Sequence, residues 1–211
     1  MGYGGSYAGA FNALLRIIYP DVFWGTISSS GVTKAIYDYW EYYSPIAEYA
    51  PKSCIAAQRT LTHIVDNILI GVNETDWTYK LKDAFGLENV THSNDFANIL
   101  AGGISNWQSL NWDPDVSIPE FYNYCANISD TEVLYPATEP LRSVASSIIS
   151  KAGYNANSTL TAQMLNYIGY VNLTSVTACV GESQDACFSN NNASFYEMDD
   201  ISQTWRAWYD S

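Results

Sequence analysis

Apolar residues first recur at helical spacing between residues 8 and 19. They share one side of the predicted helix: Ala10, Leu14, Ile17 and Ile18. Pro20 ends this helix. The next apolar run, 22–27, is uninterrupted and bounded by turn residues, which is typical of a strand buried on both faces of a parallel sheet. The pattern therefore predicts a turn, a helix and a strand in that order.

From about residue 32 the hydrophobic period becomes helical and stays so for most of the chain. The stretch 32–49 is rich in Tyr and Trp, and we expect these rings to pack in a core or groove rather than form a ligand platform. Pro51 opens a helix that reaches a break near Gly71. Further helices are predicted at 75–85, 94–107, 117–126, 139–152 and 160–171, and the segment 172–194 is polar.

A serine with small neighbours precedes the first predicted helix, in the sequence Gly4-Gly5-Ser6-Tyr7-Ala8-Gly9. In a nucleophile elbow, a serine occupies a strained turn between a strand and a helix, and only small neighbours let the backbone fold so closely. The pattern reads G-x-S-x-A, with alanine in place of the second glycine of the usual motif. The alternative is a glycine-rich turn with an ordinary serine. The helix and strand that follow favour the elbow.

Composition and charge exclude several classes of protein. With 211 residues, 47% of them hydrophobic, the chain has enough apolar material for a core. The net charge of −13 argues against nucleic acid or an anionic membrane as a partner. No stretch has the apolar length that a membrane span needs. A dimer stays open as an oligomeric state.

Cysteine and asparagine usage favour an oxidising, glycosylating compartment. The four cysteines, an even number, are compatible with two disulfides. The sequence has no C-x-x-C pair and only two histidines, so we expect neither a metal nor a cofactor. Glycosylation sequons begin at Asn73, Asn89, Asn127, Asn157, Asn172 and Asn192. We therefore expect a secreted, extracellular protein or a vacuolar or lysosomal one.

The first residues lack the basic and apolar regions of a signal peptide. The five residues before Ser6 are also too few to supply a core strand together with its neighbours. We therefore expect the sequence to be an internal piece of a longer protein.

Several segments resemble the prolyl carboxypeptidase and dipeptidyl-peptidase II family of serine peptidases, and in particular its secreted fungal members. Besides the segment 4–9, the resemblance is carried by Tyr-Pro-Asp-Val-Phe-Trp at 19–24, Ser-Ser-Ser-Gly-Val at 28–32 and Leu-Lys-Asp-Ala-Phe-Gly-Leu at 81–87. It spans nearly the whole chain, and it is strongest around Ser6.

The resemblance implies a fragment of an α/β-hydrolase fold with a mostly α-helical cap domain. Residues 1–32 would belong to the hydrolase core, 33–195 to the cap, and 196–211 would return towards the core. It also implies a disulfide between Cys54 and Cys125 within the cap. For Cys179, a bond to Cys187 is the local alternative to a partner outside the fragment.

In that family the residue at the Ser6 position is the acylated nucleophile, and the backbone N–H of Tyr7 would form half of the oxyanion hole. The Asp and His of the triad follow the cap, so we expect them to lie beyond Ser211. His63 is expected to be a surface histidine on a helix, and His92 to lie at the N-terminal cap of a helix. The isolated chain should then be inactive. The family's substrates are peptides with proline near a terminus, cleaved on the carboxyl side of proline.

Two other classes of function stay open at this point. A secreted helical binding module could carry the same cysteines, sequons and aromatic residues, with Ser6 in an ordinary turn. Alternatively, the same elbow could serve an esterase or lipase, because a fold does not fix a substrate. The sequence also does not distinguish a carboxypeptidase from a dipeptidyl-peptidase.

Overall fold

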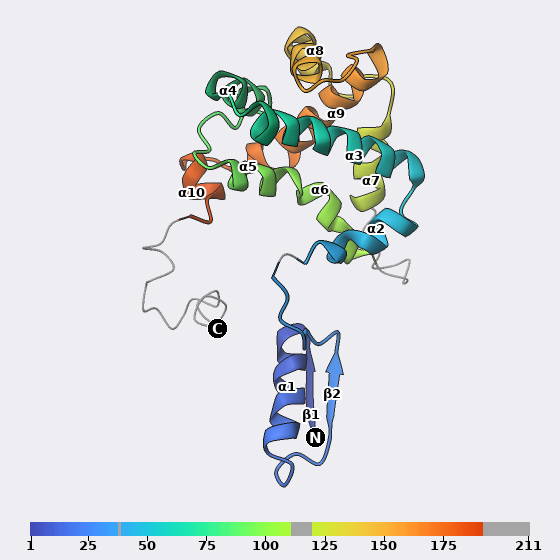
Figure 1. Cartoon of the computed structure of the whole chain (residues 1–211), viewed down its shortest axis with the longest axis vertical. Helices are drawn as coiled ribbons and strands as arrows, with labels where there is room; N and C mark the ends of the chain where they lie inside the picture. Colours follow the sequence, from blue (N-terminus) through green and yellow to red (C-terminus); the bar gives the residue numbers. More distant parts are fainter. Residues whose placement is uncertain (38, 111–119, 192–211) are drawn as a thin grey trace. The chain divides into compact units, whose positions relative to one another are not determined.

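The computed structural model describes residues 1–37, 39–110 and 120–191 (Figure 1). By its internal contacts the chain divides into two units, Met1–Pro45 and Ile46–Ser211. This division lies after residue 45, whereas the predicted boundary between core and cap lies after residue 32. The predicted return segment, 196–211, is outside the described residues.

Unit 1 is built around a strand, a helix and a second strand. These are β1 (Gly2–Gly5), α1 (Ser6–Ile18) and β2 (Thr26–Ser29). The two strands pair in parallel, with Gly2 opposite Thr26 and Gly5 opposite Ser29. Since parallel strands need a crossover connection, α1 links them and packs against both. The predicted order of turn, helix and strand is confirmed.

The position of the second strand differs from the prediction of 22–27. The N–H groups of Val22 and Phe23 both donate to the Tyr19 carbonyl at 3.1 Å, so this region forms a turn. β1 has only four residues, and its ladder of pairs with β2 begins at Thr26. Val22 and Trp24 are exposed, which contradicts burial on both faces. The prediction from the apolar run 22–27 is therefore wrong about both the bounds and the burial of the strand.

One side of α1 is apolar and exposed. Of its residues only Gly9 and Ala10 are buried, while four large side chains are more than half exposed: Phe11, Leu14, Ile17 and Ile18. A helix in an α/β protein normally buries such a stripe against a sheet. Among the described residues the sheet has two strands, which is too little surface to cover it.

Within the aromatic stretch 32–49, the structure has two short helices. These are η1 (Trp40–Tyr43) and α2 (Ser44–Tyr49). Tyr37, Trp40 and Tyr49 are exposed, so our expectation of core packing for this stretch is wrong for these residues.

The secondary-structure elements described in unit 2 are all helices. Its elements are α3 (Lys52–Asp66), η2 (Asn67–Val72), α4 (Thr75–Ala84), α5 (Ser93–Leu100), α6 (Gly102–Ser105), η3 (Asn106–Ser109), α7 (Glu120–Ser129), η4 (Pro136–Leu141), α8 (Arg142–Lys151), α9 (Ser158–Thr174), η5 (Val176–Ala178) and α10 (Gln184–Phe188). Helix α7 packs against both α3 and α9, and α8 packs against α9 and α4.

Most predicted helices of unit 2 are confirmed, although residues 117–119 of the helix predicted at 117–126 lie outside the described residues. The helix predicted at 94–107 is divided into α5, α6 and η3. The helix predicted at 139–152 begins as the 3₁₀ helix η4, which contains Pro140. Proline is unfavourable inside an α-helix, because its ring collides with the carbonyl of the preceding turn. The polar segment 172–194, described up to residue 191, contains η5 and the short helix α10.

The core of unit 2 surrounds α9, which is buried on nearly all sides. Phe85 meets the rings of Phe96 and Tyr167 edge to face, with centroids 5.7 and 5.5 Å away. The disulfide Cys54–Cys125 joins α3 to α7 inside this core, and both cysteines are buried. It is the pair that the family resemblance implies.

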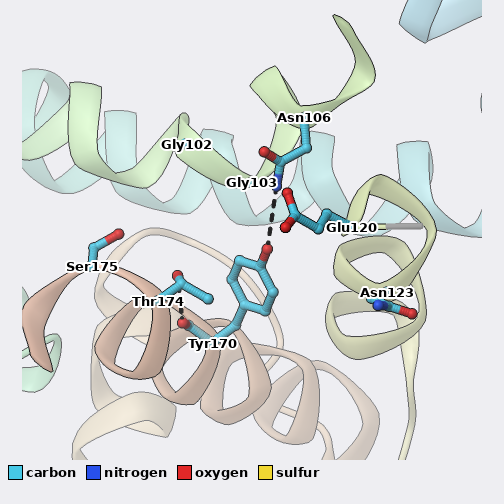
Figure 2. Close-up of a pocket in the computed structure, with 8 residues that line it drawn as sticks. All are labelled: Gly102, Gly103, Asn106, Glu120, Asn123, Tyr170, Thr174 and Ser175. Carbon is cyan, nitrogen blue, oxygen red and sulfur yellow. Dashed lines mark hydrogen bonds between the residues drawn. The ribbon is translucent and has the colours of Figure 1, made fainter. Parts of the chain in front are cut away.

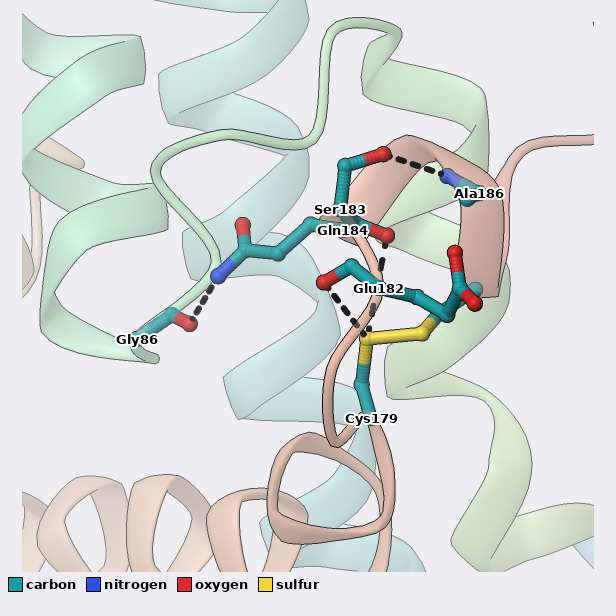
Figure 3. The surroundings of a disulfide bond; sticks show 7 residues. Gly86, Cys179, Glu182, Ser183, Gln184 and Ala186 are labelled. Atoms are coloured by element: carbon teal, nitrogen blue, oxygen red, sulfur yellow. Dashed lines mark hydrogen bonds between the residues drawn. A yellow bond between two sulfur atoms is a disulfide. The ribbon is translucent and has the colours of Figure 1, made fainter.

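A second disulfide, Cys179–Cys187, closes a short loop that carries α10 (Figure 3). Gln184 of this loop donates to the Gly86 carbonyl at 2.8 Å and accepts from the Asn89 N–H at 2.9 Å. Asp185 accepts from the Thr91 N–H at 2.8 Å and from its hydroxyl, and these bonds lower the pKa of the carboxyl. The loop therefore holds residues 86–91 in place.

A buried asparagine connects α9 to the loop before η4. Asn166 is fully buried, and its side-chain oxygen accepts from the Leu134 N–H at 2.7 Å. Its amide nitrogen donates to the Glu132 carbonyl at 2.8 Å. These two bonds satisfy the buried Asn166 amide, since buried polar groups need partners.

We predict that Asn166→Ala destabilises the chain by about 1–3 kcal/mol, because it leaves two backbone groups without their partner. The free energy of unfolding in urea measures this effect. The exposed Asn155 provides a matched control, and Asn155→Ala should change the stability by less than about 0.5 kcal/mol. Equal losses in the two variants would contradict this account of Asn166.

Candidate functional site

Ser6 lies at the junction of β1 and α1 in an unusual backbone conformation. Its φ is 54°, in the left-handed region, whereas Gly5 before it is extended, with φ −107° and ψ 155°. For a residue other than glycine, such a φ costs of the order of 1 kcal/mol or more and is common at functional sites. The side chain of Ser6 is exposed. A tight turn thus presents a serine between a strand and a helix.

Two glycines let α1 approach β1 closely enough to form this turn. A Cβ atom on Gly4 would lie 2.5 Å from the Ala8 carbonyl oxygen, and one on Gly9 would lie 2.9 Å from the Gly4 carbonyl oxygen. Both distances are shorter than a carbon–oxygen contact allows. Ala8, which replaces the second glycine of the motif, is exposed, so its methyl group is accommodated.

The residue after Ser6 lies in the first turn of α1. Backbone N–H groups in the first turn of a helix are directed out of its N-terminus, where the helix dipole favours negative charge. The Tyr7 N–H belongs to this turn, and the Tyr7 ring is half exposed. This end of α1 therefore has the chemistry to stabilise an anion beside the Ser6 hydroxyl.

Two side chains that the sequence analysis did not single out pack against the glycines of this site. A Cβ on Gly2 would meet the Asn12 side chain at 2.7 Å, and one on Gly9 would meet the Ser28 Oγ at 3.0 Å. Asn12 lies on α1, and Ser28 on β2. Ser28 comes close to Gly9 through the pairing of β1 with β2. Its distance from Ser6 along the chain therefore does not predict this contact.

The two histidines lie in unit 2, so unit 1 contains no histidine. His63 is exposed on α3, which confirms its expected surface position. His92 occupies the N-cap position of α5, as expected, but its side chain makes no capping hydrogen bond.

Over residues 1–37, 39–110 and 120–191, no cluster of three or more His, Cys, Asp or Glu side chains is arranged to hold a metal ion. In the same part of the chain, no helix combines the length and the apolar character that crossing a membrane requires.

The predicted glycosylation sites differ in accessibility. Asn73, Asn89 and Asn157 are exposed, whereas Asn127 and Asn172 are half-buried, and Asn192 lies outside the described residues. Asn157 also caps α9, because its side-chain oxygen accepts from the Leu160 N–H at 2.9 Å. Asn89 lies in the loop that α10 holds.

Comparison with known proteins places the chain in a family. The model of the S28 serine carboxypeptidases matches residues 1–178, which include Ser6 and most of unit 2. The chain belongs to the S28 family. It is 45% identical over 209 residues to a "Probable extracellular serine carboxypeptidase" of Arthroderma benhamiae, an alignment that covers 98% of this chain and 29% of that protein. The predicted family is confirmed.

More distant relatives match shorter parts. "Serine protease vicPa" of Bipolaris victoriae is 24% identical over 127 residues, 60% of this chain and 23% of that protein. "Probable serine protease EDA2" of Arabidopsis thaliana is 39% identical over 59 residues, 28% of this chain and 12% of that protein. The chain thus spans less than a third of the length of these relatives. S28 members have an α/β-hydrolase fold, and this mostly helical S28 chain with its two-stranded sheet is consistent with a fragment of it.

We predict that Gly4→Ala disrupts the turn at Ser6, because the new methyl group would collide with the Ala8 carbonyl and the Asn12 side chain. Hydrogen–deuterium exchange over residues 1–30 should become faster than in the unchanged chain. Gly5→Ala provides the matched control, since its methyl group would lie 3.7 Å from its nearest neighbour, the Ser29 carbonyl oxygen. Equal exchange in the two variants would contradict the proposed role of the close approach.

Proposed function

We propose that this chain is part of a secreted serine peptidase in which Ser6 is the nucleophile of a nucleophile elbow. The left-handed Ser6 between β1 and α1 is the observation that carries the proposal. Membership of the S28 serine carboxypeptidases supports it independently.

The proposed reaction uses the Ser6 hydroxyl and the N-terminus of α1. The Ser6 Oγ attacks the carbonyl carbon of the scissile bond while a histidine takes its proton. The Tyr7 N–H donates to the oxyanion that develops on the carbonyl oxygen. The C–N bond then breaks, the histidine gives its proton to the leaving amine, and water hydrolyses the acyl-serine.

We propose that the Asp and His of the triad come from outside these 211 residues. His63 and His92 lie in the helical unit, one on a helix surface and one at a helix start, and neither follows a core strand. A general base must come within hydrogen-bond reach of the nucleophile. The chain on its own is therefore expected to lack peptidase activity.

For the substrates we propose peptides with proline near a terminus, cleaved on the carboxyl side of proline. This part of the proposal rests on the resemblance to the prolyl carboxypeptidase and dipeptidyl-peptidase II group. We assign the helical unit 2 to the role of the cap domain, which would limit access to short chain ends.

Labelling with a fluorophosphonate tests the role of Ser6. We predict that the isolated chain stays unlabelled, whereas the full-length gene product that contains it is labelled at Ser6. Ser6→Ala should abolish labelling and lower kcat by at least about 10³-fold. Ser30 also has a positive φ, 49°, and so Ser30→Ala is the matched control, expected to leave labelling intact.

The same experiment distinguishes the alternatives. Robust labelling of the isolated chain would show that a base is supplied from within it. A full-length protein that never becomes labelled would favour a binding module. Faster turnover of a simple chromogenic ester than of a proline-containing chromogenic peptide would favour an esterase.

Secretion is proposed from the sequons, the two disulfides and the extracellular relative. We predict that material from a fungal secretory host carries N-glycans, so that Asn89→Gln lowers the mass by one glycan. Asn98 is exposed but is not part of a sequon, and Asn98→Gln should leave the glycan mass unchanged. Intact mass spectrometry measures both. Secreted protein without any glycan would contradict this assignment.

A further inference from the structure

Unit 2 contains a polar cavity of about 520 Å³, a size that fits a small ligand (Figure 2). Gly102, Gly103 and Asn106 form one wall, from α6 and η3. The other residues of the lining come from α7, α9 and the position after α9: Glu120, Asn123, Tyr170, Thr174 and Ser175. All of these lining residues belong to unit 2.

Among the described residues that line the cavity, one carries a formal charge, the carboxylate of Glu120. The other described side chains of the lining are amides, hydroxyls and a phenol, with no Lys or Arg among them. Glu120 is exposed. Among the described residues, ion pairs join Arg142 to Glu139 and Lys151 to Glu74, and Glu120 takes part in neither. A ligand that complements this lining carries a positive charge and hydrogen-bonding groups.

Tyr170 adds a directed hydrogen-bonding group beside this carboxylate. Its hydroxyl accepts from the Asn106 amide at 3.5 Å (Figure 2). Its ring packs against Tyr124 with centroids 5.0 Å apart, which fixes its position. Burial, and then the negative charge of Glu120, raise the pKa of the phenol. The hydroxyl therefore stays protonated and can donate a hydrogen bond to an oxygen atom of a ligand.

We propose that this cavity binds a primary ammonium group carried by a small polar molecule or a peptide. Glu120 neutralises the ammonium, and Tyr170 and the amide of Asn123 bind the polar groups next to it. Such a group comes from a peptide amino terminus or from a lysine side chain, and both present the same chemistry to Glu120. The site does not depend on Ser6 or on the proposed peptidase activity.

A titration of the ¹⁵N-labelled 211-residue chain tests this site. The probes are triglycine amide, which has a free amino terminus, and its N-acetylated form, which differs only in lacking the ammonium. Nα-acetyl-lysine methylamide presents the ammonium on a side chain, and glucose is a neutral polar probe. We expect triglycine amide or the lysine derivative to shift the backbone amides of Gly102, Gly103 and Asn123. The stronger of the two identifies the source of the ammonium.

Variants separate the carboxylate from general effects of charge. We expect Glu120→Gln to weaken binding about tenfold, since it removes a charge-assisted hydrogen bond. Glu182 is exposed and does not line the cavity, so Glu182→Gln should leave binding unchanged. Tyr170→Phe keeps the ring and should also weaken binding. Unchanged amide shifts elsewhere in the spectrum show that each variant is folded.

Four results would overturn the proposal. The first is equal binding of the acetylated and free tripeptides. The second is a response to glucose at the same amides and of the same strength. The third is the absence of shifts at these amides with both ammonium probes. The fourth is full binding by the Glu120→Gln variant.

Discussion

The region around Ser6 depends on backbone contact between α1 and β1 at Gly4 and Gly9. At these two positions a side chain would occupy the space of a carbonyl oxygen from the neighbouring element. The close contact lets the chain reverse direction within the turn, and the left-handed φ of Ser6 accompanies it. The strain at Ser6 is thus balanced by packing of the helix on the strands, which is how strained residues are retained in folded proteins.

Unit 2 differs from unit 1, because it is stabilised by an extensive core of its own. Helix α9 is buried on nearly all sides, and the disulfide Cys54–Cys125 crosses the core. The Asn166 side chain makes hydrogen bonds to two backbone groups of the loop before η4. These features account for a helical body with a complete core. The proposed nucleophile thus lies in unit 1, which has a small core, and the proposed ligand cavity lies in unit 2, which has a large one.

The sequence predicted the parts of this structure that depend on local pattern. Helical periodicity located α1, α3, α4 and α9, and the small residues around Ser6 indicated a strand–turn–helix junction. The strand at 22–27 was misplaced because the bounds of β2 are set by pairing with the short β1, not by its own apolar run. The helix predicted at 94–107 is interrupted between α5 and α6, after Leu100. Gly103 of α6 lies against the ring of Tyr124, which occupies the space that a side chain there would need.

Features that depend on tertiary contact were not predictable in this way. Helix α10 is held by hydrogen bonds to residues more than ninety positions earlier, such as the bond from Gln184 to Gly86. The cavity beside Glu120 is formed by three separate segments, and no motif connects Glu120 to Tyr170. The role of Ser6 stays a prediction. Its position at the junction of β1 and α1 is observed, whereas no described side chain in unit 1 identifies its catalytic partners.

The uncovered apolar side of α1 has a consequence for the behaviour of the chain in solution. Phe11, Leu14 and Ile17 are exposed next to Ile18, on a molecule with a net charge of −13. At low ionic strength, mutual repulsion keeps such molecules apart. Added salt shortens the range of that repulsion to about 10 Å at 0.1 M and leaves the attraction between apolar surfaces in place. The colloidal stability of the purified chain is therefore expected to fall as salt is added.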